Sequence, residues 1–224
     1  MPLPASIRRF AAACLAGLLL PLPALAQGPD AEWQAYEPAL ADGARHANLW
    51  QAGWTTIYAG SLALNAWQAS EASSRDDRYD ARVGAVKSAL ALGGMLLDRQ
   101  PHPAAWQELS TGETGDIEGA RALLEAVAAE ERRRRSWEAR LGSLAVNTAA
   151  GLLIAVGDGR ERDGAINFAT GMLVSELQLQ TQPRQATAAI NRFQPVSASV
   201  GDLHLKGEYA LLVGPSQLGL ALRY

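Results

Sequence analysis

The residue types that most often perform catalysis are few in this chain and stand far apart. The histidines are His46, His102 and His204, and none has the HxxxH or HExxH spacing with which two imidazoles bind a zinc ion. We therefore expect each histidine to be a surface residue or a hydrogen-bonded residue of the core. The only cysteine, Cys14, lies inside an apolar N-terminal run, so the rest of the chain has no thiolate nucleophile or ligand.

Acidic residues gather in one short segment, SSRDDRYDA at residues 73–81. Paired carboxylates can act as a general acid and a general base. Arginines alternate with these acids, however, which is typical of a salt-bridged surface turn. The sequence thus predicts no catalytic residue, no cofactor and no metal site. A small hydrolase of envelope polymers remains an alternative, which requires an acid pair or a histidine cluster assembled by the fold.

Tryptophans are the more suggestive residues for binding. Trp50, Trp54 and Trp67 are separated by nearly whole helical turns, so a helix would present them on one broad face. Such a face could contact a lipid, a glycan or a partner protein. The alternative, which we favour, is that these large rings fill gaps beside small Ala and Gly residues in a helical core.

Four consecutive arginines form the strongest cluster of charge: Arg132, Arg133, Arg134 and Arg135. This run could hold phosphates, anionic lipid head groups or an acidic partner. Three acids, Glu130, Glu131 and Glu138, lie within helical reach of the run. We therefore favour a solvated and partly paired helix face.

Apolar periodicity predicts helices as the elements that position these residues. The first runs from about residue 30 to 70 and is expected to be interrupted near Pro38 or Gly43. The second is capped by Asp76 or Asp77 and ends at Pro101–Pro103. A third, capped by Thr114 or Asp116, is expected to continue from Ile117 to Val156, and a fourth runs from Ile166 to Gln180 after the turn GDGRERDG.

The two helical hairpins resemble each other in sequence. An ungapped offset of 87 places Trp50 on Trp137, Gly84 on Gly171 and Ser88 on Ser175. Two copies of one helix–turn–helix unit would produce such a match. The predicted fold is mainly α, with a duplicated helical hairpin at about 45–103 and 132–190 that resembles a four-helix bundle, followed by a C-terminal β-hairpin.

The N-terminal segment has the pattern of a cleaved signal peptide. Arg8 and Arg9 precede an apolar run at residues 10–22, and Ala24-Leu25-Ala26 supplies the small residues of a cleavage site. Removal of residues 1–26 takes two arginines away from 20 basic residues against 23 acidic ones, which leaves a net charge of about −5. A helical domain at residues 27–190 would follow, and so acidic a chain is a poor candidate for nucleic acid.

From Val196 onward the apolar period changes from helical to two, which predicts strands within residues 195–224. The last eight residues, QLGLALRY, place a polar residue at Gln217, a glycine at Gly219 and apolar or aromatic residues at Leu222 and Tyr224. This pattern resembles the C-terminal signal of outer-membrane β-barrel proteins, and that resemblance implies reading by the barrel assembly machinery. It also implies membrane contact through Leu218, Leu220, Leu222 and Tyr224.

The resemblance covers those eight residues alone, and the chain departs from the family in one respect. It offers two or three strands, whereas the smallest single-chain barrels need about 8. The strands would therefore pack on the helices as a soluble hairpin, on further subunits or on another protein.

Four apolar stretches raise the alternative of an inner-membrane four-helix protein: 54–69, 83–97, 141–156 and 166–179. Each is shorter than the ~20 residues of a typical span and contains a polar residue. A cleaved signal would also place the four arginines outside, against the positive-inside tendency. Our interpretation from the sequence is a non-catalytic exported envelope protein, periplasmic and associated with the outer membrane, that binds or scaffolds an envelope protein or lipid, with homo-oligomers also compatible.

Overall fold

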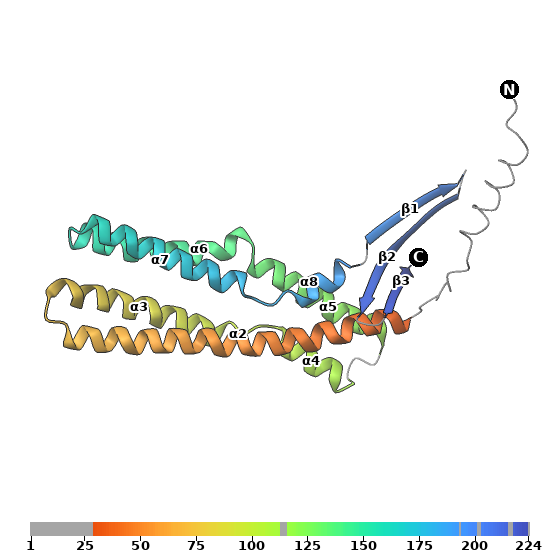
Figure 1. The fold of residues 1–224 in the computed structure, drawn as a ribbon, viewed down its shortest axis with the longest axis horizontal. Helices are drawn as coiled ribbons and strands as arrows, with labels where there is room; N and C mark the ends of the chain where they lie inside the picture. Colours follow the sequence, from red (N-terminus) through yellow and green to blue (C-terminus); the bar gives the residue numbers. More distant parts are fainter. Residues whose placement is uncertain (1–28, 113–115, 193, 201–202, 215–216, 224) are drawn as a thin grey trace, which may run out of the picture. The chain divides into compact units, whose positions relative to one another are not determined.

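The computed structural model describes residues 29–112, 116–192, 194–200, 203–214 and 217–223, with side chains only within 33–192. The predicted signal peptide, Thr114, Tyr224 and the side chains of His204, Leu218, Leu220 and Leu222 lie outside this description. Residues 29–192 form one compact helical unit, whose elements are labelled in Figure 1, and the C-terminal strands belong to a second unit. The protein is mainly helical and bundle-like, as the sequence predicts.

The base of the helical unit is built around the first part of α2, Pro29–Glu71. It packs against α4, His102–Ser110, α5, Ile117–Arg134, and α8, Gln185–Ile190. Leu40 and Leu124 are fully buried in this core, among small residues such as Ala44, Ala120, Ala128 and Ala186. Small residues let helix backbones approach closely, so this base is a closely packed core.

Two helical hairpins extend from the base and lie side by side (Figure 1). The first pairs the second part of α2 with α3, Arg75–Leu97. The second pairs α6, Trp137–Leu152, and the π-helical turn η1, Leu153–Gly157, with α7, Glu161–Gln180. Gly159 adopts a φ of 72° in the second turn, a conformation in which residues with a Cβ are strained.

Ion pairs join the turns of the two hairpins, and those of the acidic segment 73–81 reach the second hairpin. The Arg160 guanidinium donates to Asp80 across the hairpins, and lies 2.9 Å from Asp158 and 3.0 Å from Asp163 in its own turn. Arg75 lies 3.3 Å from the buried Asp158 carboxylate. The far ends of the hairpins are therefore fixed to each other.

The predicted break in the first helix is wrong, because α2 is continuous over 43 residues and contains Pro38. A proline inside a helix costs about 3 kcal/mol. Here Tyr36, Leu40 and Ala44 on either side are buried against the base, and their packing outweighs the lost hydrogen bond. The predicted end at Pro101–Pro103 is only partly right: α3 ends at Leu97, and this segment begins α4.

The capping residue of α3 also differs from our expectation. Ser74, not Asp76 or Asp77, accepts the backbone N–H of Asp77 at 3.0 Å, and both acids lie in the first turn. Asp116 caps α5 by accepting the N–H of Gly119 at 2.7 Å, as predicted. The last long helix begins at Glu161 instead of Ile166, because its acids occupy the first turn.

The predicted continuous helix from Ile117 to Val156 is wrong, because the helix is interrupted at Arg135 and Ser136. Ser136 accepts the N–H of Ala139 at 3.5 Å and so starts α6. Arg134 anchors the end of α5 by donating to Asp98. The four arginines therefore lie at a corner between base and hairpins.

Three strands follow the helical unit as an antiparallel sheet in the order β1, β2, β3. They are β1, Gln194–Val200, β2, Leu203–Gly214, and β3, Gln217–Arg223. Leu211 is opposite Leu220, and Tyr209 is opposite Leu222. Which side chains share a face, and whether any meets a membrane, stays a prediction.

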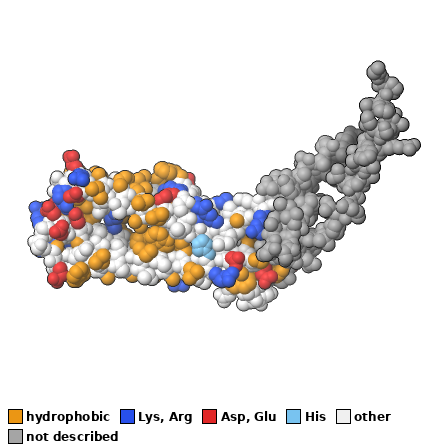
Figure 2. Space-filling view, viewed as in Figure 1, with side chains coloured by type: hydrophobic (Ala, Val, Ile, Leu, Met, Phe, Trp, Pro, Cys, Tyr) orange, Lys and Arg blue, Asp and Glu red, His pale blue; other side chains and the backbone are white. Residues whose placement is uncertain are grey.

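The hairpins and the base differ in what they expose. Every exposed large hydrophobic side chain within the described residues lies on α2, α3, α6, η1 or α7. Val156 is 77% exposed and Trp67 61%, for example. Figure 2 shows hydrophobic side chains on the body of the helical unit and charged ones gathered at the end formed by the turns. The exterior of the hairpins is therefore apolar between charged ends.

Candidate functional site

Each hairpin carries a polar notch where its two helices approach. In the first, Asn65 on α2 donates to the Ser61 carbonyl oxygen at 2.7 Å and lies against Gly84 on α3. A Cβ on Gly84 would overlap the Asn65 amide, so only glycine fits there without a shift. Ser88, one turn after Gly84, is buried.

The second hairpin repeats this arrangement. Asn147 on α6 donates to the Ser143 carbonyl oxygen at 2.8 Å and to Ser175 Oγ at 3.3 Å. Ser175 in turn donates to the carbonyl oxygen of Gly171 at 2.9 Å. A Cβ on Gly171 would overlap the Asn147 amide.

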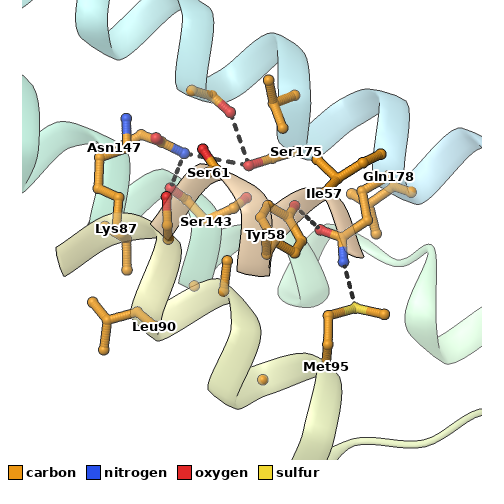
Figure 3. A pocket seen from close by; sticks show the side chains of 18 of the residues that line it. Ile57, Tyr58, Ser61, Lys87, Leu90, Met95, Ser143, Asn147, Ser175 and Gln178 are labelled. Carbon is orange, nitrogen blue, oxygen red and sulfur yellow. Dashed lines mark hydrogen bonds between the residues drawn. The ribbon is translucent and has the colours of Figure 1, made fainter. Parts of the chain in front are cut away.

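Between the notches lies a cavity of about 650 Å³, lined mainly by α2, α3, α6 and α7. Both notches contribute to its wall, so serine and asparagine side chains from two hairpins face one space. Figure 3 shows Asn147 and Ser143 of the second hairpin close to Ser175 of the same hairpin and to Ser61 of the first. A cavity of this volume is in the range that holds a small organic ligand.

Lys87 on α3 is the cation in the body of this cavity. Its side chain is half-buried, and its Nζ donates to Asn167 Oδ1 at 2.9 Å. Among the described residues, no carboxylate lies within ion-pair distance of it. Burial lowers the pKa of the Lys87 ammonium, because a charge is poorly solvated there.

The cavity is more apolar around Trp50, Tyr58 and Met95, which form one buried cluster. Tyr58 Oη donates to Gln178 Oε1 at 2.8 Å, and Gln178 Nε2 lies 3.0 Å from Met95 Sδ (Figure 3). Burial raises the pKa of Tyr58 to about 12, so its hydroxyl stays protonated. The arrangement can hold an apolar body and leave a hydrogen-bonding group at the notches.

The three tryptophans singled out from the sequence differ in their surroundings. Trp50 is 7% exposed and donates to Thr181 Oγ1 at 3.1 Å, and Trp54 donates to the same hydroxyl at 3.0 Å. Both pack in the core cluster beside the cavity, as the favoured interpretation held. Trp67 is 61% exposed and lies outside that cluster, and its contact with a partner or a membrane stays a prediction.

Two of the four arginines, Arg133 and Arg134, form ion pairs, and the break in the helix gives Arg132 and Arg135 different surroundings. Arg133 and Arg134 both contact Glu130, at 2.6 and 2.7 Å, and Arg134 contacts Asp98 at 2.6 Å. The hydrogen bond from Arg133 and the positive charges of the pair lower the pKa of Glu130 to about 2. Arg135 donates to the carbonyl oxygen of Gln182 at 2.6 Å, and Arg132 is exposed.

His102 belongs to the base and is hydrogen-bonded, as expected for a core histidine. Its Nε2 lies 2.8 Å from Glu131 Oε1, and both side chains are almost fully buried. Glu131 also accepts the backbone N–H groups of Ala186 and Thr187 at the start of α8. Burial alone would raise the pKa of Glu131, but the hydrogen bonds lower it by more. The net pKa is therefore below its ordinary value, and the carboxylate is charged.

His46 is separate from this pair and contacts the Thr181 carbonyl oxygen at 3.1 Å and Gln185 at 3.0 Å. Within the described residues, no three side chains of His, Cys, Asp and Glu are grouped to hold a metal ion.

Comparison with known proteins finds no protein similar to this chain. Neither protein-family models, nor curated proteins, nor solved structures match the chain.

The residues that line the cavity were missed as a site in the sequence, where Lys87, Asn147 and Asn167 count only as polar interruptions of apolar stretches. Two signals could have found them. Lys87 is one of two lysines among 20 basic residues, and a lone lysine in an apolar helix requires a reason. The motif SxxxN also occurs twice, at Ser61–Asn65 and Ser143–Asn147.

Proposed function

We propose that this protein is an exported envelope protein that binds a small amphipathic molecule in the cavity between its two helical hairpins. The observation that carries the proposal is the cavity of about 650 Å³ with polar notches and an apolar cluster in one wall. The cavity is partly open to solvent. A molecule with an apolar body would bury the apolar part of its wall, and this burial favours binding.

The shape of the lining supports an amphipathic ligand. Ser61, Asn65, Asn147 and Ser175 supply hydrogen-bonding groups, whereas Trp50 and Met95 supply apolar contact. Binding sites for small molecules commonly combine an apolar wall with a few polar groups that fix orientation. An envelope lipid or its acyl-chain precursor has this combination.

Export and association with the outer membrane are part of the same proposal. The sequence of residues 1–26 supports export, and the alternation in residues 217–224 supports contact of the strands with a membrane, a partner protein or the assembly machinery. Envelope fractionation tests this part. Tyr224→Asp, or deletion of residues 195–224, is expected to release the protein into the soluble periplasm.

A binding function accounts for the observed contacts better than the alternative of a hydrolase. A hydrolase needs a base that its substrate can reach. The described ion pairs contain one histidine–carboxylate pair, His102–Glu131, and both side chains are 1–2% exposed. The Glu131 carboxylate also accepts hydrogen bonds from the backbone of α8, so the pair holds helices of the base together.

Native mass spectrometry of protein extracted gently from the envelope tests the binding proposal. We expect a bound molecule at one copy per chain in the wild type. Ala91 lines the cavity, so Ala91→Trp fills it and should abolish the bound mass, whereas Ala89→Trp on the exposed side of the same helix should retain it. Equal occupancy in the two variants, with unchanged circular dichroism, would place the ligand elsewhere and refute the proposal.

The apolar exterior favours a second candidate, in which the hairpins lie in a bilayer. Residues 141–157 of α6 and η1 contain no ionisable side chain and span about 25 Å, close to a hydrocarbon thickness of about 30 Å. By length and composition, one helical stretch among the described residues, Ile117–Gly157, is apolar enough to cross a membrane. Large exposed apolar surfaces usually mark an interaction site.

The same fractionation separates the two candidates. A bilayer-embedded hairpin pair would require detergent for extraction even after residues 195–224 are deleted. A periplasmic binding protein would appear in the soluble fraction after that deletion.

A further inference from the structure

We infer that Lys87 binds the anionic head group of the ligand, so that the cavity selects an amphipathic anion, a carboxylate or phosphate joined to an apolar body. This inference rests on the proposed binding function and specifies its ligand class.

Electrostatics in the cavity favour a negative charge at Lys87. The other charged side chains that line it, Asp98, Arg133 and Arg134, lie at one end and are held in ion pairs there. The described contacts of the Lys87 ammonium are with one neutral residue, Asn167, at 2.9 and 3.5 Å. A partly buried cation without a carboxylate partner is costly, and an anionic ligand would offset this cost.

The second hairpin shows that the fold does not require a cation at this place. Gly84 lies against Asn65 in the first hairpin, and Gly171 lies against Asn147 in the second. These glycines are therefore equivalent positions of α3 and α7. Three residues after these glycines stand Lys87 and Val174, and both line the cavity. An apolar residue is therefore compatible with the packing, and Lys87 breaks the symmetry of two otherwise similar walls.

The surroundings of Lys87 Nζ also suit an anionic group. A Cβ on Gly171 would lie 2.6 Å from this nitrogen and 1.8 Å from Asn147 Oδ1, so the glycine lets both polar groups lie close to α7. Asn147 and Ser175 lie next to the same glycine and are hydrogen-bonding groups without charge. An ammonium is a compact charge with three donors, which matches a carboxylate or phosphate oxygen without demanding the planar geometry of arginine.

Titration of the full-length mature protein with three probes of one chain length tests the inference: decanoate, decyl phosphate and decanol. We expect the wild type to bind the anions about 10-fold or more tightly than decanol, the range of one charge-assisted hydrogen bond. Lys87→Gln should lose this preference and keep its affinity for decanol. Arg82→Gln, which removes an exposed cation from the same helix, should behave as the wild type.

The possible outcomes separate the inference from the function on which it rests. Failure of all three probes to bind would overturn both. Equal binding of decanoate, decyl phosphate and decanol to the wild type would overturn the anion selectivity and leave the binding function standing. A preference for anions that Lys87→Gln retains would show that another cation recognises the head group, and a preference for one anion identifies its chemistry.

Discussion

At the residue scale, Lys87 carries opposite consequences for stability and for binding. It is half-buried with a neutral partner, and its pKa is lowered by burial, so its charge destabilises the fold. A folded-state pKa below the unfolded value means that stability rises as the pH increases through the folded pKa. Sites of function often retain such destabilising groups.

We therefore expect Lys87→Met to stabilise the protein while weakening its binding of anions. Replacing a poorly solvated ammonium by an apolar chain of similar length should raise Tm by about 2–4 °C, which corresponds to about 1 kcal/mol for a chain of this size. Calorimetry of ligand-free protein provides the measurement. A fall in Tm at neutral pH would show that the ammonium stabilises the fold, contrary to our account.

The His102–Glu131 pair provides a second prediction, which concerns acid stability. The pKa of Glu131 is lower in the folded protein, so its charge stabilises the fold above the unfolded pKa of about 4.3 and this contribution is lost as the pH falls through the folded pKa. Glu131→Gln should cost about 3 kcal/mol at pH 7 and make stability less dependent on pH below about 4.

Urea unfolding at several pH values checks this prediction. Glu125→Gln, an exposed change on the same helix, is the control and should alter stability by less than about 0.5 kcal/mol. If Glu131→Gln were as mild as Glu125→Gln at pH 7, the buried pair would not be the lock between α4, α5 and α8 that we describe.

At the element scale, the two notches support a duplicated hairpin but change its alignment. Gly84 and Gly171 are separated by 87 residues, in agreement with the offset found in the sequence. Asn65 corresponds to Asn147, at an offset of 82, because the second hairpin has a longer turn region that includes η1. An ungapped comparison could not place these asparagines together.

The notches predict a strong difference between two glycines of α3. Gly84→Ala forces a methyl group onto the Asn65 amide and should destabilise the protein by about 1–3 kcal/mol. Gly93→Ala meets nothing within 4 Å and should stabilise by up to about 1 kcal/mol, since alanine favours the helix.

Thermal or urea unfolding of the two variants measures this difference. Asn65→Ala added to Gly84→Ala should recover part of the loss, because it removes the overlapping amide. Tolerance of Gly84→Ala at the level of Gly93→Ala would mean that the helices are not in contact at the first notch.

Much of the helical fold could be predicted from apolar periodicity, and the departures have local causes. Proline favoured a break at Pro38, but burial of the neighbouring Leu40 holds α2 together. Charge suggested one continuous face at residues 132–135, but Ser136 caps a new helix there. The cavity could not be predicted, since it depends on which hairpin faces contact each other and no local pattern encodes that pairing.

At the scale of the helical unit, apolar and polar surfaces are arranged differently in its two parts. The base buries Leu40 and Leu124 in a packed core. The hairpins instead expose residues such as Leu173 and Val156, and place Asn147 and Lys87 toward the cavity between them. Ion pairs of Arg160 with Asp80 hold the turns together, so the cavity walls are fixed at both ends.

This arrangement gives an acyl chain two places to bind: the cavity and the exposed apolar exterior. Affinity alone does not separate them, so position must be measured. A crystal structure with 11-bromoundecanoate does so, because anomalous scattering locates the bromine independently of the protein.

Our account predicts a carboxylate within about 2.7–2.9 Å of Lys87 Nζ and a bromine inside the cavity near Trp50, Tyr58 and Met95. Bromine found only on the outer face of the hairpins, with the cavity free of ligand, would contradict it.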